Sequence, residues 1–172
     1  MNLQSNDFEI FGLAPGFSVD LAALDERWKA LQREAHPDRF STADAQAQRQ
    51  AMQWSVRINE AYRRLKDPLK RASYLCELHG VPIGAEDNTA MPAAFLIQQM
   101  QWREELEEAV TGEDMERMLE QVATVRRDML AALAQTADVE KDHPALAKQV
   151  RALMFVERFA RDVEQRLDQH GQ

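Results

Sequence analysis

The seven residues EAHPDRF (34–40) decide the fold, because they interrupt two long segments that otherwise favour helix. Pro37 has no amide proton and its ring clashes with the preceding turn, so a helix that reaches it has to end. Proline also moves the preceding residue, His36, out of the helical region of backbone space. The stretch therefore predicts an exposed bend that presents an imidazole, a rigid ring and the carboxylate of Asp38 together.

Apolar patterns predict a helix on each side of this bend. Over residues 21–35, apolar side chains recur every three or four positions, which is typical of one buried helix face. After the bend, Ser41-Thr-Ala-Asp44 resembles a capping box, and the helix that follows is expected to run to about residue 66. The expected buried positions are Leu21, Leu24, Trp28, Leu31 and Ala35 in the first helix and Met52, Ser55, Ile58, Tyr62 and Leu65 in the second.

Shorter elements complete the N-terminal half. Residues 7–12 predict one or two helical turns. The pair Asp67-Pro68 predicts a new helix over 68–79, because a capping carboxylate is followed by proline at the first helical position. Residues 80–91 are rich in turn-forming types and predict a linker.

Three helical periods follow the linker, at about 92–110, 114–135 and 144–169. Their apolar residues recur at near-heptad spacing, and the links between them are short. The expected seam is Met115, Met118, Val122, Val125, Met129 and Leu133 in the second helix and Leu146, Val150, Leu153, Val156, Ala160, Val163 and Leu167 in the third. The spacing and the short links together predict an antiparallel three-helix bundle. The fold class expected for the whole chain is therefore all-α.

Charge is distributed unevenly between the two halves. Residues 1–79 carry 11 basic and 11 acidic side chains, whereas residues 80–172 carry 10 basic and 18 acidic ones. The formal net charge of −8 argues against a nucleic-acid partner, since such proteins usually carry a basic patch. The difference between the halves predicts two modules with different partners.

The sequence offers little support for catalysis or for metal binding. Neither a phosphate-binding GxxxxGK[ST] loop nor a GxSxG nucleophile motif occurs, so an enzyme is not expected. Cys76 is the single cysteine, which excludes an internal disulfide and favours a reducing compartment. The histidines lack the spacing of metal ligands, so no metal or cofactor is expected. They are His36, His79, His143 and His170.

The N-terminus lacks the basic and apolar regions of a signal peptide. No stretch reaches the roughly 20 apolar residues that a membrane helix needs. A cytoplasmic protein without a membrane partner is therefore expected.

Four stretches resemble one known family. EAHPDRF between its two helices, followed by INEAYRRLKDPLKRASYLCELHG (58–80), is similar to a J-domain. FEIFGL (8–13) and AAFLIQQMQWREELEEA (93–109) narrow the resemblance to the HscB-type co-chaperones of iron–sulfur cluster assembly. The resemblance covers almost the whole chain. It implies a J-domain at 1–79, built as an antiparallel helical hairpin with an HPD loop, a linker at 80–91, and an acidic three-helix bundle at 92–172 that binds the cluster scaffold.

The resemblance implies that the J-domain binds a DnaK/HscA-type ATPase chaperone and stimulates ATP hydrolysis. The residues implied for this contact are His36, Pro37, Asp38, Lys29, Arg33 and Arg39. Exposed cations of this kind steer a protein toward an acidic partner surface. Two positions depart from the usual J-domain pattern: Ala35 stands where a tyrosine is common, and Arg39 stands where a lysine is common. Arginine keeps the charge but changes the donor geometry.

The helix expected at 92–110 has more apolar residues than one buried stripe requires. Its seam is expected to be Phe95, Gln99, Trp102, Leu106 and Ala109. The pattern alone leaves three alternatives open: the remaining apolar residues widen the core, pack against the J-domain or bind a partner. The resemblance implies that they bind an IscU-type cluster scaffold protein, through Leu96, Ile97, Met100, Gln101, Glu104, Glu108 and Phe155. Gln101 stands where the family often has an acidic residue.

Two other readings compete with this one. A generic J-domain adaptor would deliver a different client through its C-terminal bundle, and the two readings differ only at residues 96–100 and their neighbours. A purely structural helical protein would leave the His36-Pro37-Asp38 tripeptide, called the HPD segment below, without an explanation.

Overall fold

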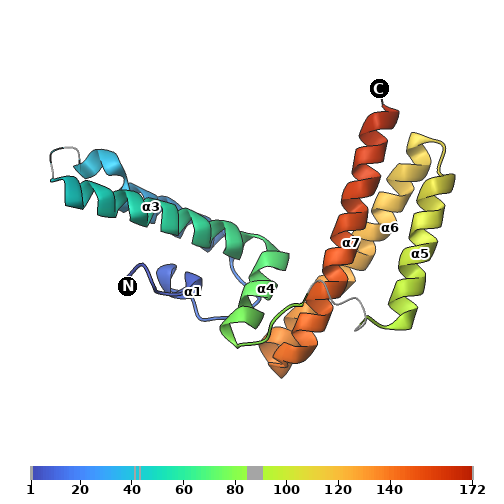
Figure 1. Ribbon diagram of the computed structural model, residues 1–172, viewed down its shortest axis with the longest axis horizontal. Coiled ribbons are helices and arrows are strands. Elements are labelled where there is room, and N and C mark those ends of the chain that lie inside the picture. The colour runs from blue at the N-terminus through green and yellow to red at the C-terminus, as the bar shows by residue number, and fades with distance from the viewer. Residues whose placement is uncertain (1, 41, 43, 85–90, 172) are drawn as a thin grey trace. The chain divides into compact units, whose positions relative to one another are not determined.

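The computed structural model describes residues 2–40, 42, 44–84 and 91–171, and every regular element within those ranges is a helix (Figure 1). The expected all-α class is confirmed. The chain divides into two compact units, residues 1–75 and 76–172. The elements in order are α1 (Asp7–Ile10), α2 (Leu21–Ala35), η1 (Pro37–Phe40), α3 (Ala45–Lys66), α4 (Pro68–Leu78), α5 (Ala93–Glu108), α6 (Gly112–Ala134), η3 (Gln135–Glu140) and α7 (His143–His170).

Side-chain caps explain where the helices of the first unit begin. The carboxylate of Asp20 accepts hydrogen bonds from two backbone amides at the start of α2. Asp67 does the same for the Lys70 amide in α4, at 3.0 Å, as the sequence predicted. In α3 the cap is Asp44, which accepts from the Ala47 amide at 2.8 Å. Ser41 of the predicted capping box lies outside the described residues. Each cap satisfies amides that have no partner inside the helix.

A row of polar contacts fixes how α2 and α3 pair. The side-chain Nε2 of Gln32 donates to Asn59 Oδ1 at 2.7 Å, and the Ser55 hydroxyl donates to Gln32 Oε1 at 3.1 Å. The indole Nε1 of Trp28 donates to the same Asn59 oxygen at 3.0 Å, and its ring stacks on Tyr62 with centroids 4.5 Å apart. Sliding one helix along the other would leave these half-buried groups unpaired, so the row specifies the register of the hairpin.

Two expected core positions are wrong. Leu21 is 48% exposed at the first turn of α2, and Met52 is 55% exposed on α3. In α3 the core face passes instead through Ala51, Ile58 and Leu65, which lie seven residues apart. Because each residue advances about 100° around a helix, Met52 stands well off that face. The apolar pattern located the helix correctly but misplaced its face at this end.

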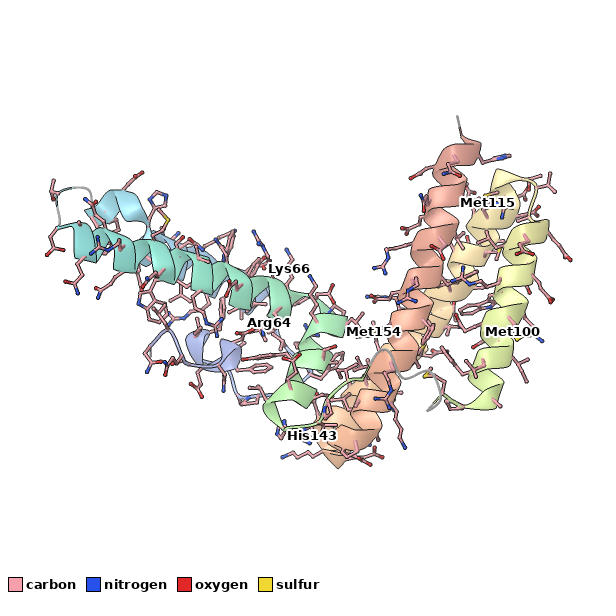
Figure 2. All side chains as sticks on the ribbon, viewed as in Figure 1. Arg64, Lys66, Met100, Met115, His143 and Met154 are labelled. Carbon is pink, nitrogen blue, oxygen red and sulfur yellow. The ribbon has the colours of Figure 1, made fainter. Side chains whose placement is uncertain are left out.

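Asp7 links three helices of the first unit. Its side chain is fully buried, and its two carboxylate oxygens pair with Arg57 Nη1 at 2.8 Å and with Arg64 Nε at 2.9 Å, both from α3. The Asp7 amide donates to the hydroxyl of Tyr74 in α4 at 2.9 Å. The Arg64 guanidinium also lies over the Tyr74 ring, 4.6 Å from its centroid. Figure 2 labels Arg64 on α3, on the side of α1.

The second unit is the expected helical bundle, in which α7 packs against both α5 and α6 (Figure 1). Most of the predicted seam is confirmed as buried: Met115, Met118, Val122 and Leu133 in α6, and Leu146, Val150, Leu153, Val156 and Val163 in α7. Phe159 is also fully buried, although the pattern assigned the seam to its neighbour Ala160. Its ring stacks on Trp102 of α5, with centroids 5.2 Å apart.

The link between α6 and α7 is not the expected loop. The helix continues as the π-helical segment η3 and ends at Lys141, whose φ of 54° is left-handed. The hydroxyl of Thr136 donates to the Ala132 carbonyl at 2.9 Å, and the side chains of Thr136 and Ala137 are buried. This burial explains why the chain stays helical beyond the predicted end.

We expect Asp7→Asn to destabilise the first unit by about 3–5 kcal/mol, because it removes the fully buried charge that pairs with the partly buried guanidinium groups of Arg57 and Arg64. The free energy of unfolding is to be measured in urea, following NMR signals of the Ile10 and Ile58 methyl groups that report on this unit. Asp162→Asn is the matched control, since its partly exposed pair with Arg103 should contribute at most about 1 kcal/mol. A loss below ~1 kcal/mol in Asp7→Asn would contradict the role assigned to this charge.

Candidate functional site

The HPD segment forms the exposed corner that the sequence predicted. His36 ends α2 in an extended conformation, with φ −62° and ψ 129°, as expected for a residue before proline. The chain then turns through the short 3₁₀ helix η1, in which the Arg39 amide donates to the His36 carbonyl at 3.0 Å. The side chains of His36 and Asp38 are 55% and 92% exposed. They are therefore available to a partner.

The geometry assigns a tautomer to His36. Its Nδ1 lies 3.2 Å from the Asp38 amide nitrogen and 3.6 Å from the Asp38 carboxylate. A protonated Nδ1 would pair with the carboxylate, whereas an unprotonated Nδ1 accepts from the amide, and it cannot do both. The amide contact is the shorter one, so Nδ1 is assigned as the acceptor from the Asp38 amide.

The basic residues named from the sequence surround this corner. Lys29 and Arg33 are exposed and lie one turn apart on α2. Arg39 is exposed on η1, and its Nη1 donates to the Arg33 carbonyl at 3.4 Å. The three cations and the HPD segment therefore belong to one continuous part of the first unit.

The second candidate surface lies on α5, where apolar residues outside the seam face solvent. Leu96, Ile97 and Met100 are 39%, 55% and 64% exposed, while Trp102 and Leu106 of the predicted seam are buried. Figure 2 labels Met100 on this helix. The alternative that these residues widen the core of the bundle is therefore wrong.

A groove between α5 and α7 gathers part of the predicted set. Its lining includes Leu96, Met100 and Glu104 from α5 and Phe155 from α7. The Phe155 ring meets Phe95 edge-on, with centroids 6.2 Å apart and planes at 70°. This contact fixes the ring as one wall of the groove.

Three predicted residues lie outside the groove: Ile97, Gln101 and Glu108 are exposed on α5. Two arginines that the sequence did not single out line it instead. The Arg158 guanidinium lies 5.6 Å from the centroid of the Phe155 ring, and Arg103 Nη1 pairs with Asp162 at 2.9 Å. Their positions one turn after Phe155 and Met100 were the available signal.

The remaining histidines and the cysteine do not form a metal centre. Across the described ranges, three or more His, Cys, Asp or Glu residues never come close enough to hold an ion. His79 and His143 stack with centroids 3.6 Å apart. Cys76 is buried, and burial raises the pKa of its thiol to about 11, so it stays protonated. Helices long and apolar enough to cross a bilayer are likewise absent from the part of the chain that the structure describes.

Comparisons with known proteins find similarity to one family, the HscB co-chaperones. The family model described as the HSCB C-terminal oligomerisation domain matches residues 91–164. A co-chaperone protein HscB homolog from Burkholderia thailandensis is 45% identical over 166 residues, which cover 95% of this chain and 94% of the relative. One from Bordetella petrii is 47% identical over 157 residues, covering 91% and 92%.

Solved structures agree with these relatives. Chaperone HscB from Vibrio cholerae has a TM-score of 0.84 and 35% identity, covering 96% of this chain and 99% of its own. Human co-chaperone protein HscB has a TM-score of 0.91 and 25% identity, covering 96% and 84%.

The stacked histidines predict a pH dependence. Burial and the neighbouring His79 lower the pKa of His143 from its usual 6.5, although Asp142 opposes them. The unfolded chain keeps the usual pKa, so below about pH 6.5 it binds more protons than the folded chain does. The free energy of unfolding therefore falls as the pH drops through the lowered pKa of His143 in the folded protein. NMR titration of the imidazole and urea unfolding at about pH 7.5 and about pH 5.5 test this. His143→Gln should lose less stability between the two pH values, and an equal loss would contradict the assignment.

Proposed function

This chain belongs to the HscB family of co-chaperone proteins, and from that membership we propose that it is an adaptor for iron–sulfur cluster assembly. It binds an IscU-type scaffold protein, delivers it to a DnaK/HscA-type ATPase chaperone and stimulates ATP hydrolysis by that chaperone. In this proposal residues 1–79 are the J-domain, 80–91 the linker and 92–172 the scaffold-binding bundle.

The exposed apolar residues of α5 are the observation that carries the proposal. Leu96, Ile97 and Met100 remain in solvent although the bundle has a filled core of its own. Apolar side chains that a helix leaves exposed in one group favour a protein partner. With Phe155 they would form the apolar centre of an interface, and Glu104 and Glu108 would form its polar rim.

The HPD segment supports a recognition role rather than a chemical one. His36 and Asp38 are largely exposed, so the Asp38 carboxylate is free to pair with a cation of the ATPase. Lys29, Arg33 and Arg39 would add steering toward an acidic surface. Contacts of this kind accelerate hydrolysis by favouring one conformation of the ATPase over another.

Because both proposed binding sites lie on one chain, delivery of the scaffold to the ATPase would be more effective than a chance encounter of the two proteins. A scaffold held by the bundle and an ATPase held by the J-domain meet as an intramolecular pair, at an effective concentration that the connection between the sites sets. A different client on the same bundle would use the same logic, so the identity of the client is decided by binding measurements.

Asp38→Ala should leave the fold intact, because the side chain is exposed, but should abolish stimulation of ATP hydrolysis. A lost charge pair at an interface costs about 2 kcal/mol or more, so we expect stimulation to weaken roughly thirtyfold or more. Steady-state ATPase rates with a DnaK-class chaperone measure this. Glu60→Ala, at an exposed carboxylate of α3, is the matched control and should behave as the unaltered protein. Normal stimulation by Asp38→Ala would refute the J-domain role.

Met100→Ala combined with Phe155→Ala should raise the dissociation constant for the scaffold by about thirtyfold or more, as expected when interface anchors are truncated. Stimulation of the ATPase without scaffold should not change. Isothermal titration calorimetry measures the affinity, and Val139→Ala removes an equally exposed apolar side chain as the control.

An unchanged dissociation constant would place the client site elsewhere. Sedimentation of the free chain belongs in the same experiment, because the family model matching the bundle is described as an oligomerisation domain.

A further inference from the structure

An apolar hollow of about 330 Å³ lies between the end of α2 and the first turns of α3. Its floor consists of the buried side chains Ile10, Leu31 and Ile58. Ala35, which directly precedes the HPD segment, and Phe40, the last residue of η1, both line it. Residues that flank the HPD segment on both sides therefore line this hollow.

The hollow exists because the facing side chains are small. Ala35 on α2 and Ala47 and Ala51 on α3 contribute only methyl groups to it. Trp54 is the large side chain that α3 places there, three residues after Ala51 and on the same face. It is half-buried, so one part of the indole contacts the protein while another part remains accessible to solvent.

Hydrogen bonds to the backbone carbonyls of Phe40 and His36 hold the corner, and Trp54 takes part in neither of them. The side-chain Nε2 of Gln48 donates to the Phe40 carbonyl at 3.1 Å, which ties the end of η1 to α3. The Arg39 amide bonds to His36 within the corner itself. Farther along the hairpin, the Gln32, Ser55 and Asn59 contacts hold α2 against α3, whereas beside Ala35 the two helices are separated by the hollow.

We propose that Trp54 is a positioning residue for the HPD segment. Its indole is the largest side chain that α3 places on the hollow, which Ala35 of α2 and Phe40 of η1 also line, and so limits how far the end of α2 and η1 move relative to α3. Removing the indole enlarges the hollow and takes apolar surface from its wall, so the corner opens more often. The inference rests on the proposed function only in its ATPase measurement.

The first test follows amide hydrogen exchange in the free, full-length protein by NMR. In Trp54→Ala we expect exchange of the Arg39 amide to rise about tenfold, as for a local opening, while the Leu65 amide changes little. A merely structural loss of stability would raise exchange at both amides together. Met52→Ala, at an exposed side chain of the same helix, is the matched control and should leave both unchanged. If Trp54→Ala does not fold, Trp54→Leu takes its place, with a smaller rise expected.

The second test restores the volume from the opposite helix. Ala35→Tyr combined with Trp54→Ala places a ring in the same hollow from α2 and should return Arg39 exchange to within about twofold of the unaltered protein. Failure of the double variant to recover slow exchange, when it folds, would overturn the proposal.

ATPase stimulation supplies the functional measurement. Trp54→Ala should raise the concentration needed for half-maximal stimulation by about tenfold, and the double variant should lower it again. If the unaltered protein does not stimulate the ATPase, the proposed function fails while the exchange measurements still decide the role of Trp54. If Trp54→Ala leaves both Arg39 exchange and half-maximal stimulation unchanged, the indole does not position the segment.

Discussion

The buried carboxylate of Asp7 is the constraint on which the N-terminal unit depends. A single negative charge with no exposure to solvent pairs with two guanidinium groups of α3, and the adjacent backbone amide reaches the hydroxyl of Tyr74. Three helices thus meet at one residue from the start of the chain. Because an unpaired charge at the Asp7 position would be costly, the pairing favours one arrangement of α1, α3 and α4.

With that arrangement fixed, the polar side chains of the hairpin serve different purposes along its length. Gln32, Ser55 and Asn59 are half-buried and satisfy one another, which sets the register. The cations near the HPD segment are exposed and remain available to a partner. Half-buried polar side chains therefore set the register of the hairpin, whereas the exposed cations near the HPD segment remain accessible to solvent.

Most of the fold could be predicted from signals between residues that are close in sequence. Capping residues such as Asp20 and Asp67, and the proline after His36, predicted where helices begin and end, because these effects involve only neighbouring residues. The apolar periods predicted the bundle seam for the same reason. Exposure of Met52 and burial of Phe159 were not predictable, since the face of a helix that meets the core depends on partners distant in sequence. The ion pairs of Asp7 and the stacking of His79 on His143 join residues more than 45 positions apart and leave no local pattern.

The two candidate surfaces also differ in how far the sequence could predict them. The HPD corner was predictable because proline dictates it locally. The excess of apolar residues on one helix left burial of Leu96, Ile97 and Met100 in the core as an alternative, and the resemblance favoured an exposed binding surface. The groove was not predictable in detail, because Phe155, Arg158 and Arg103 reach it from two helices whose relative rotation is set by packing. Resemblance to a family supplied Phe155, and neither periodicity nor resemblance supplied the two arginines.

The burial of Cys76 has a consequence for chemistry near iron. A protein that works beside cluster assembly meets scaffold thiolates, labile iron and sulfide, and any accessible thiolate of its own would compete for them. Here the single sulfhydryl is enclosed and stays protonated at neutral pH. Its one thiol is thereby a poor ligand for iron and a slow partner in thiol exchange, and such inertness would suit the adaptor role proposed above.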